Sequence, residues 1–170
     1  MIHKKRTRKD FESLVTMLAD TDVLIRKNAR ESLVLMGNPA ISSLAWVLQN
    51  SKVYKVRWEA AKALATIGSE KAIPALVKAL EDLESDVVWL AAEALKKFRK
   101  TAWPEILNSL IKRRAVSVSL RHAAHHVFRK QQEDGFNELL ENLRKALVSE
   151  TTPERIPLAA YCVLSRMKDE

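Results

Sequence analysis

The sequence has 170 residues, a single cysteine and a formal net charge of +8 at pH 7. Hydrophobic residues make up 47% of it and charged residues 29%, with only three glycines. This composition excludes an internal disulfide and supplies enough apolar side chains for a buried core. No apolar run approaches the roughly 18 residues needed to cross a membrane, so no membrane span is expected. The lone cysteine fits a reducing compartment, and we expect a cytoplasmic protein.

The basic charges gather in two windows, residues 1–10 and 96–130, which leaves the rest of the chain mildly acidic. Segregated charge of this kind favours an acidic partner. It also has a structural interpretation, because lysine and arginine at helix C-terminal ends interact favourably with the helix dipole. We expect residues 1–9 to form a basic N-terminal arm. It leads into an amphipathic pattern and does not resemble a secretory signal.

Helical periodicity fills the remaining residues, 10–170, which are expected to form one domain. Asp10 is the predicted N-cap of a first helix that ends near Ala19, and a second helix ends at Met36. Gly37 and Gly68 are expected to end helices. A third helix is predicted over residues 39–49, and a fourth contains residues 56–64 and ends at Ile67. Three further helix pairs are predicted, and their second helices end near residues 98, 130 and 167. No segment alternates with period two, so the sequence predicts an all-α fold.

One nine-residue pattern recurs along the chain. VRWEAAKAL, residues 56–64, has apolar or small residues at its first, fifth, eighth and ninth positions, which lie on one helix face. Similar segments begin at residues 25, 87, 119 and 156, giving spacings of 31, 31, 32 and 37 residues. A period near 31 with two helices per repeat predicts an α-solenoid of about five helical hairpins.

The segments IPALVKALEDLESDVVWLAAEAL and VRWEAAKALATIG resemble HEAT repeats, in particular the short repeats of bilin-lyase subunits. The resemblance covers residues 11–167. It implies a solenoid whose second helices line a concave face, and it implies binding more often than catalysis. The arginine at the second position of the pattern is present in two repeats as Arg26 and Arg57. Later repeats depart from it, with Val88, Leu120 and Pro157 there.

The third, seventh and tenth positions of the pattern are expected to face that concave groove. Trp58 and Trp89 share the third position, where two exposed indoles would anchor a partner, although both could instead lie flat over the core. Trp46 and Trp103, on first helices, are expected to be packing residues. The predicted partner-binding residues are Lys27, Trp58, Lys62, Trp89, Glu93, Arg121, His125 and Phe128.

These residues lead to the hypothesis of a non-enzymatic adaptor that captures an acidic or amphipathic segment of a protein partner. The alternative is nucleic-acid binding through the N-terminal arm and the second basic window. The residues that would bind the phosphates are Lys96, Lys97, Arg99, Lys100, Arg113, Arg114 and Arg129. The sequence does not specify an oligomeric state.

No catalytic residue, metal or cofactor is expected. His122 and His126 have the spacing of a helical metal pair, and Cys162 would lie beside His125 in the next repeat, but no CxxC or HExxH motif accompanies them. Two enzymatic alternatives remain open, a bilin lyase and a base-excising DNA glycosylase. The glycosylase would use Trp58, Trp89, Glu59, Glu93 and Arg121.

Overall fold

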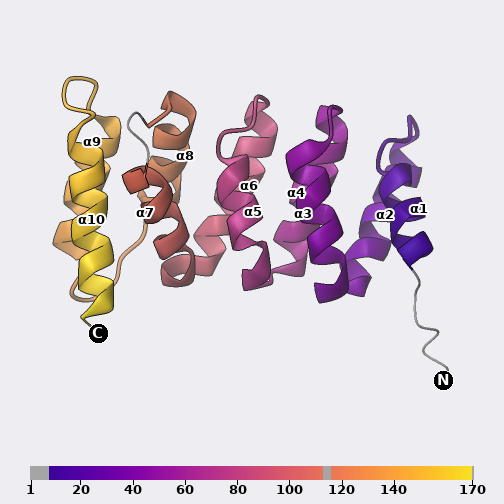
Figure 1. Ribbon diagram of the computed structural model, residues 1–170, viewed down its shortest axis with the longest axis horizontal. Coiled ribbons are helices and arrows are strands. Elements are labelled where there is room, and N and C mark those ends of the chain that lie inside the picture. The colour runs from indigo at the N-terminus through magenta and orange to yellow at the C-terminus, as the bar shows by residue number, and fades with distance from the viewer. Residues whose placement is uncertain (1–7, 113–115, 170) are drawn as a thin grey trace. The chain divides into compact units, whose positions relative to one another are not determined.

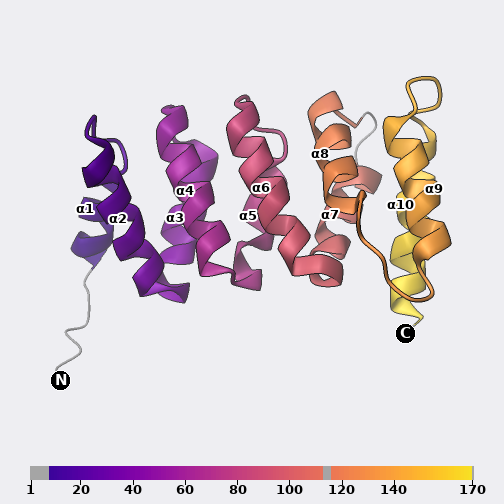
Figure 2. The same ribbon diagram turned by 180° about the vertical axis from the view of Figure 1, so that it is seen from behind.

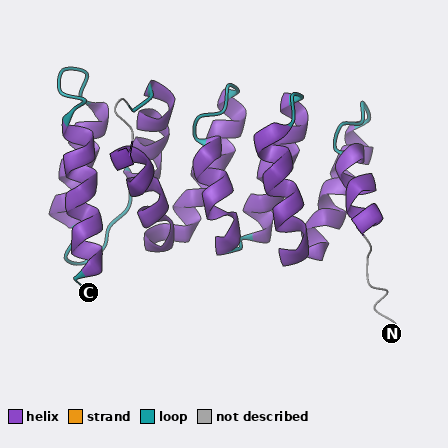
Figure 3. Cartoon of the chain, viewed as in Figure 1, coloured by secondary structure: helices purple, strands orange, loops and turns teal. Residues whose placement is uncertain are grey.

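The computed structural model describes residues 8–112 and 116–169, and all regular secondary structure within them is helical (Figure 3). The predicted all-α fold is therefore confirmed. The expected N-terminal arm lies almost wholly outside the described residues. Among the helices in the described ranges, none is long and apolar enough to cross a membrane. The chain forms two compact units, Met1–Ala75 and Leu76–Glu170, each described by itself below.

Unit 1 consists of two helical hairpins (Figure 1). Its elements are α1 (Arg8–Met17), α2 (Val23–Met36), η1 (Asn38–Ala40), α3 (Ile41–Asn50), α4 (Tyr54–Ile67) and η2 (Glu70–Ala72). The predicted N-cap at Asp10 is wrong, because α1 begins at Arg8. Asp10 instead lies within the first turn of this helix. Gly37 and Gly68 follow α2 and α4 with φ of 65° and 64°, a region that glycine enters without strain.

Unit 2 contains two hairpins and the second helix of a third. Its elements are α6 (Ser85–Phe98), η3 (Arg99–Ala102), α7 (Trp103–Lys112), α8 (Val118–Phe128), α9 (Asn137–Val148) and α10 (Arg155–Lys168), while α5 (Ile73–Ala79) crosses the boundary between the units. Pro157 lies in the first turn of α10, as predicted, where its missing N–H breaks no helical hydrogen bond.

The repeated pattern correctly marks the buried face of the second helices. In α4, the residues Val56, Ala60, Ala63 and Leu64 are at most 5% exposed, and their counterparts in α6 are buried as well. The alanines let neighbouring helices approach closely, and each fully buried valine or leucine contributes roughly 1.5–3 kcal/mol through removal of its surface from water. In α8 the pattern is looser, since His126 occupies a core position and is only half-buried.

The last hairpin is turned around relative to the one before it. The first helix of that hairpin, α9, packs on α8, and the second helix, α10, packs on α7. Figure 1 shows α10 beside α7, and Figure 2, from behind, shows α9 beside α8. The expectation that Cys162 lies beside His125 is therefore wrong, because α10 is on the other side of the unit. The connection over residues 129–136 carries the chain from α8 to the start of α9.

The core of unit 2 is built around an aromatic cluster. Trp103 packs edge-on against Phe128 and Phe136, with ring centroids 5.8 Å apart in both pairs. Such edge-to-face pairs add about 0.5–1.5 kcal/mol beyond the area they bury. The predicted packing role of Trp103 is confirmed. The same prediction for Trp46 is wrong, since that indole is 66% exposed on α3.

Candidate partner-binding surface

Unit 2 has an open groove of about 640 Å³ beside α6 and α8. The turn before α6 contributes Leu83, α6 contributes Trp89, and α8 contributes His122 and His126. The buried alanines Ala92 and Ala123 also line it, and their small side chains leave room between the larger ones.

Trp89 and Leu83 are large, exposed apolar residues of this groove. Trp89 is 58% exposed, and Leu83 is 95% exposed. Trp89 is exposed because the third position of the pattern lies opposite the alanine face that packs into the core. Large apolar groups at an open groove are typical of a surface that is covered by a ligand or partner.

A polar bridge joins α6 to α8 at one end of the groove. Glu93 Oε1 lies 2.5 Å from His126 Nε2 and 2.7 Å from Lys96 Nζ. The hydrogen bond that Glu93 accepts from Lys96, followed by the one that it accepts from His126, lowers the pKa of Glu93 below its ordinary value of 4.5. Glu93 is therefore ionised at neutral pH, and it fixes the position of His126 beside the groove.

Beyond this bridge, four cations line a polar pocket of about 420 Å³: Lys96, Lys97, Arg99 and Lys130. Gln131 holds the two helix ends together, because its Nε2 donates a 3.2 Å hydrogen bond to the carbonyl oxygen of Lys96. Except for Lys96, the cations of this pocket are exposed. We call this the basic pocket.

The basic pocket brings together only part of the predicted phosphate-binding set. Lys100 instead lies 3.7 Å from a carboxylate oxygen of Glu133 and 4.4 Å from the ring centroid of Phe136. Arg129 is exposed just after α8 but does not line the pocket. Arg113 and Arg114 lie outside the described residues.

Arg99 has an unusual backbone. Its φ is 51° and its ψ is −135°, and it is the one non-glycine residue with positive φ in the described ranges. It follows α6 at the position where Gly37 follows α2, and Gly37 has nearly the same backbone angles, 65° and −135°. The sequence contained a signal for this, since Gly37, Gly68 and Arg99 are all thirteenth in the repeated pattern.

On α8, the predicted groove residues are largely turned toward the interior or α9. Phe128 is fully buried against Trp103, so its prediction as a partner-binding residue is wrong. Arg121 is half-buried and donates a 3.2 Å hydrogen bond to the carbonyl oxygen of Ser149 at the end of α9. His125 is half-buried, and burial, followed by the charge of Arg129, lowers its pKa.

In unit 1, the predicted residues form two local pairs. Lys62 Nζ lies 4.5 Å from the ring centroid of Trp58, in a cation–π contact, and Trp58 is half-buried. Lys27 Nζ lies 3.8 Å from a carboxylate oxygen of Glu31 on the exposed face of α2. Exposed pairs of this kind contribute about 0–1 kcal/mol, and they leave both cations near solvent.

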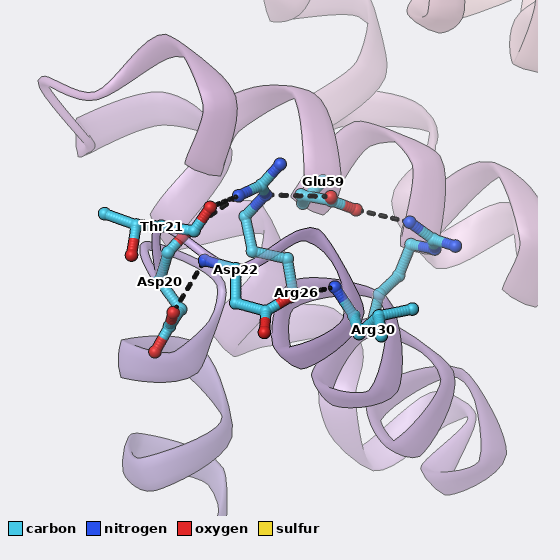
Figure 4. Close-up of polar contacts among 7 residues, drawn as sticks. Asp20, Thr21, Asp22, Arg26, Arg30 and Glu59 are labelled. Atoms are coloured by element: carbon cyan, nitrogen blue, oxygen red, sulfur yellow. Dashed lines mark hydrogen bonds and ion pairs between the residues drawn. The ribbon is translucent and has the colours of Figure 1, made fainter.

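Glu59 is a structural carboxylate. It is 4% exposed and lies between Arg30, at 2.5 Å, and Arg26, at 3.6 Å, so it ties α4 to α2 (Figure 4). Arg26 also donates hydrogen bonds to the carbonyl oxygens of Asp20 and Thr21 in the preceding turn. Arg57 makes the corresponding bond to the carbonyl oxygen of Ser51. The second-position arginines thus hold the turn that precedes their own helix.

Among the residues that the structure describes, no three potential metal ligands form a group that could hold a metal ion. His126, one half of the helical histidine pair, has Glu93 as its partner instead. The carboxylates suggested for a glycosylase are likewise engaged, Glu59 with two arginines and Glu93 with Lys96 and His126.

Comparison with known proteins matches the family model of HEAT repeats to residues 41–127, which run from the start of α3 almost to the end of α8. No curated protein matches the sequence. The matched segment is just over half of the chain and contains the copies of the pattern in α4, α6 and α8. The chain therefore belongs to the HEAT-repeat family.

Proposed function

We propose that this protein is a non-enzymatic, cytoplasmic adaptor in which residues 10–170 form an α-solenoid of about five short HEAT-like hairpins. Its function is to bind a segment of a protein partner. The spacing of 31 residues between the best copies of the pattern supports the short-repeat solenoid. The observation that carries the binding function is the open groove of unit 2 with Trp89 on its wall.

The groove has the features of a peptide-binding surface. Burying an exposed aromatic side chain contributes roughly 1.5–3 kcal/mol, and tryptophan is among the residues that most often dominate binding energy. Exposed Leu83 adds apolar surface, while His122 and His126 supply hydrogen-bonding groups that can orient a partner's backbone. In unit 1, Trp58 with Lys62 offers a second, smaller contact surface.

The glycosylase alternative receives less support from these contacts. Base excision would need a carboxylate that is free to act on the substrate. Glu59 is buried between two arginines, and Glu93 is held by Lys96 and His126.

Nucleic-acid binding is the other alternative. The carboxylates of Glu81 and Asp82 at the groove would repel a phosphate backbone, so the basic pocket is the surface that supports this alternative.

The test is selection of peptides from a random display library, first on the wild-type protein and then on two matched variants. Trp89→Ala removes the indole in the groove, and Trp46→Ala removes an indole of similar exposure elsewhere. We expect enriched peptides to bind Trp46→Ala normally and to lose at least tenfold in affinity on Trp89→Ala, with both variants melting close to wild type. Equal binding by Trp89→Ala, or no enrichment at all, would overturn the proposal.

A further inference from the structure

The groove and the basic pocket share two helices. On α6, Trp89, Glu93 and Lys97 are spaced by four residues and therefore follow one helix face. On α8, His122 and His126 follow the matching face, with Lys130 shortly after the helix ends. The two helices pack side by side and are joined by the Glu93–His126 bond and by the bond from Gln131 to Lys96. One continuous surface therefore runs from an apolar end at Trp89 to a cationic end.

The cationic end has charge that the fold does not neutralise. Lys96 has Glu93 as its partner, but Lys97, Arg99 and Lys130 form no ion pair within the described ranges. Three exposed cations around one pocket create a positive potential that attracts carboxylates or other anions. The helix dipoles oppose this potential, because the pocket lies at the C-terminal ends of α6 and α8, but the lysines at the end of α6 offset the partial negative charge there.

Arg99 adds an independent observation. It occupies a backbone conformation that residues with a side chain rarely adopt, at a position where two other repeats have glycine. Backbone strain of this kind is concentrated at functional sites, where the side chain serves a purpose other than stability. Here the residue that replaces glycine is an arginine, and it lines the basic pocket.

We infer that the partner segment is bipartite, with a bulky apolar side chain that docks at Trp89 and acidic side chains that reach the basic pocket. Seven residues of helix separate Trp89 from Lys96, which corresponds to about 10 Å along α6 at about 1.5 Å per residue. An extended peptide spans that distance in about three residues, and a helical peptide in about seven. The inference rests on the proposed function and adds the partner's charge and spacing to it.

A peptide fits this surface better than a nucleic acid does. Glu81 and Asp82 line the apolar end, and Glu93 lies between the two ends, so a polymer with one negative charge per nucleotide would meet carboxylates along most of its path. A segment with acidic groups at one end alone meets cations there and avoids the carboxylates of the other end.

The experiment begins with the peptides enriched by the display selection. We expect them to carry an apolar anchor with Asp or Glu about three or about seven positions away. Enriched peptides with the anchor but without acidic residues at a fixed spacing would leave the proposed function intact and overturn the bipartite inference. Absence of any enriched peptide would overturn both.

Direct measurement then assigns the acidic residues to the basic pocket. Fluorescence anisotropy compares an enriched peptide with its Asn/Gln counterpart on the wild-type protein, on Arg99→Gly and on Arg155→Gln, which removes an exposed cation from α10 outside both pockets. In low salt, we expect Arg99→Gly to lower the affinity for the acidic peptide about fivefold and the affinity for the neutral peptide hardly at all. Arg155→Gln should change neither affinity. Equal weakening of both peptides, or none, would contradict the assignment.

A nucleic-acid competitor completes the test. We expect a mixed-sequence 20-nucleotide single strand, and its duplex, to leave the acidic peptide bound at a salt concentration near 150 mM. If the oligonucleotide displaces the peptide from the wild-type protein but not from Arg99→Gly, the basic pocket binds nucleic acid and the inference is overturned.

Discussion

Each unit holds a glutamate between two basic side chains, Glu59 between Arg26 and Arg30 in unit 1, and Glu93 between Lys96 and His126 in unit 2. The side chain of Glu59 is 5% exposed, whereas that of Glu93 is 32% exposed. The buried carboxylate joins two helices of the core. The partly exposed one also joins two helices, but it lies at the border between an open groove and a pocket of cations.

The comparison shows that a glutamate between two basic side chains can have either of two roles in this repeated fold. A buried charge must be paired, because leaving it alone in a low-dielectric interior costs several kcal/mol. An exposed pair contributes little to stability and is screened by salt, so its residues are available to position groups for a partner. Burial, rather than residue type, separates the structural glutamate from the one at the candidate surface.

The largest expected effect comes from removing the buried carboxylate. Glu59→Ala leaves Arg26 and Arg30 without their buried partner and should lower the free energy of unfolding by about 3–5 kcal/mol. Glu93→Ala is the matched control and should cost less than about 1 kcal/mol, because water screens its ion pairs. Urea unfolding followed by circular dichroism measures both. Equal losses for the two variants would contradict the distinction between them.

The second effect concerns the backbone at Arg99. Arg99→Gly should raise the free energy of unfolding by about 1 kcal/mol, because glycine adopts its positive φ without the cost of about 1–3 kcal/mol carried by other residues. The reverse change, Gly37→Arg, should lower it by a similar amount, and a Cβ at Gly37 meets no atom within 4 Å, so the loss reports the backbone alone. Thermal unfolding of both variants checks the pair. A destabilised Arg99→Gly would show that the guanidinium supports the fold.

A smaller effect appears in acid. The pKa of Glu93 is lowered in the folded state, first by the hydrogen bond from Lys96, so its contribution to stability is present above the ordinary value of 4.5. That contribution is lost as the pH falls below 4.5 through the lowered pKa. Between pH 5 and pH 3 the free energy of unfolding of Glu93→Gln should therefore fall less than that of wild type. The difference should be roughly the free energy that ionised Glu93 contributes through Lys96 and His126. Parallel acid profiles would contradict the ionised bridge.

The smallest effect is expected at His125. Its pKa is lowered first by burial and then by Arg129 and Arg144, with His122 and His126 adding to it. Below the ordinary value of 6.5 the unfolded chain takes up a proton that the folded protein resists, so stability falls as the pH falls toward the lowered pKa. His125→Gln should flatten this slope slightly between pH 7 and pH 5 in urea unfolding. A steeper slope would show that protonated His125 stabilises the fold.

The repeated helices could be predicted from the sequence because their burial follows local periodicity. Val56 and Ala60 are buried for the same reason as their copies in α6, and Trp89 is exposed because it lies opposite them. The turned-around last hairpin could not be predicted in this way. It depends on contacts between distant residues, such as the hydrogen bonds from Arg121 to Ser149 and from Arg144 to the carbonyl oxygen of Phe128.

Phe128 shows the limit of the position rule. The tenth position is half-buried Lys96 in α6, but in α8 it is the last helical residue, and the phenyl ring turns inward to pack against Trp103. The groove itself could be predicted only in part, because its walls come from the turn before α6 and from α8 as well as from Trp89. Arg99 carried a readable signal, an arginine where the repeat has glycine.

The bonds from Arg26 and Arg57 to carbonyl oxygens six residues earlier also bear on how the chain folds. A contact across so few residues closes in about 10–100 ns, long before distant helices meet. Each such arginine can therefore set the turn of its own hairpin as soon as that segment exists, and the low contact order favours rapid folding, repeat by repeat. A φ-value near one for Arg57→Ala would register this order of events, and a value near zero would contradict it. In a repeat of this kind, the residues that fix the turn belong to the same hairpin, so the turn can form before the neighbouring repeats have folded.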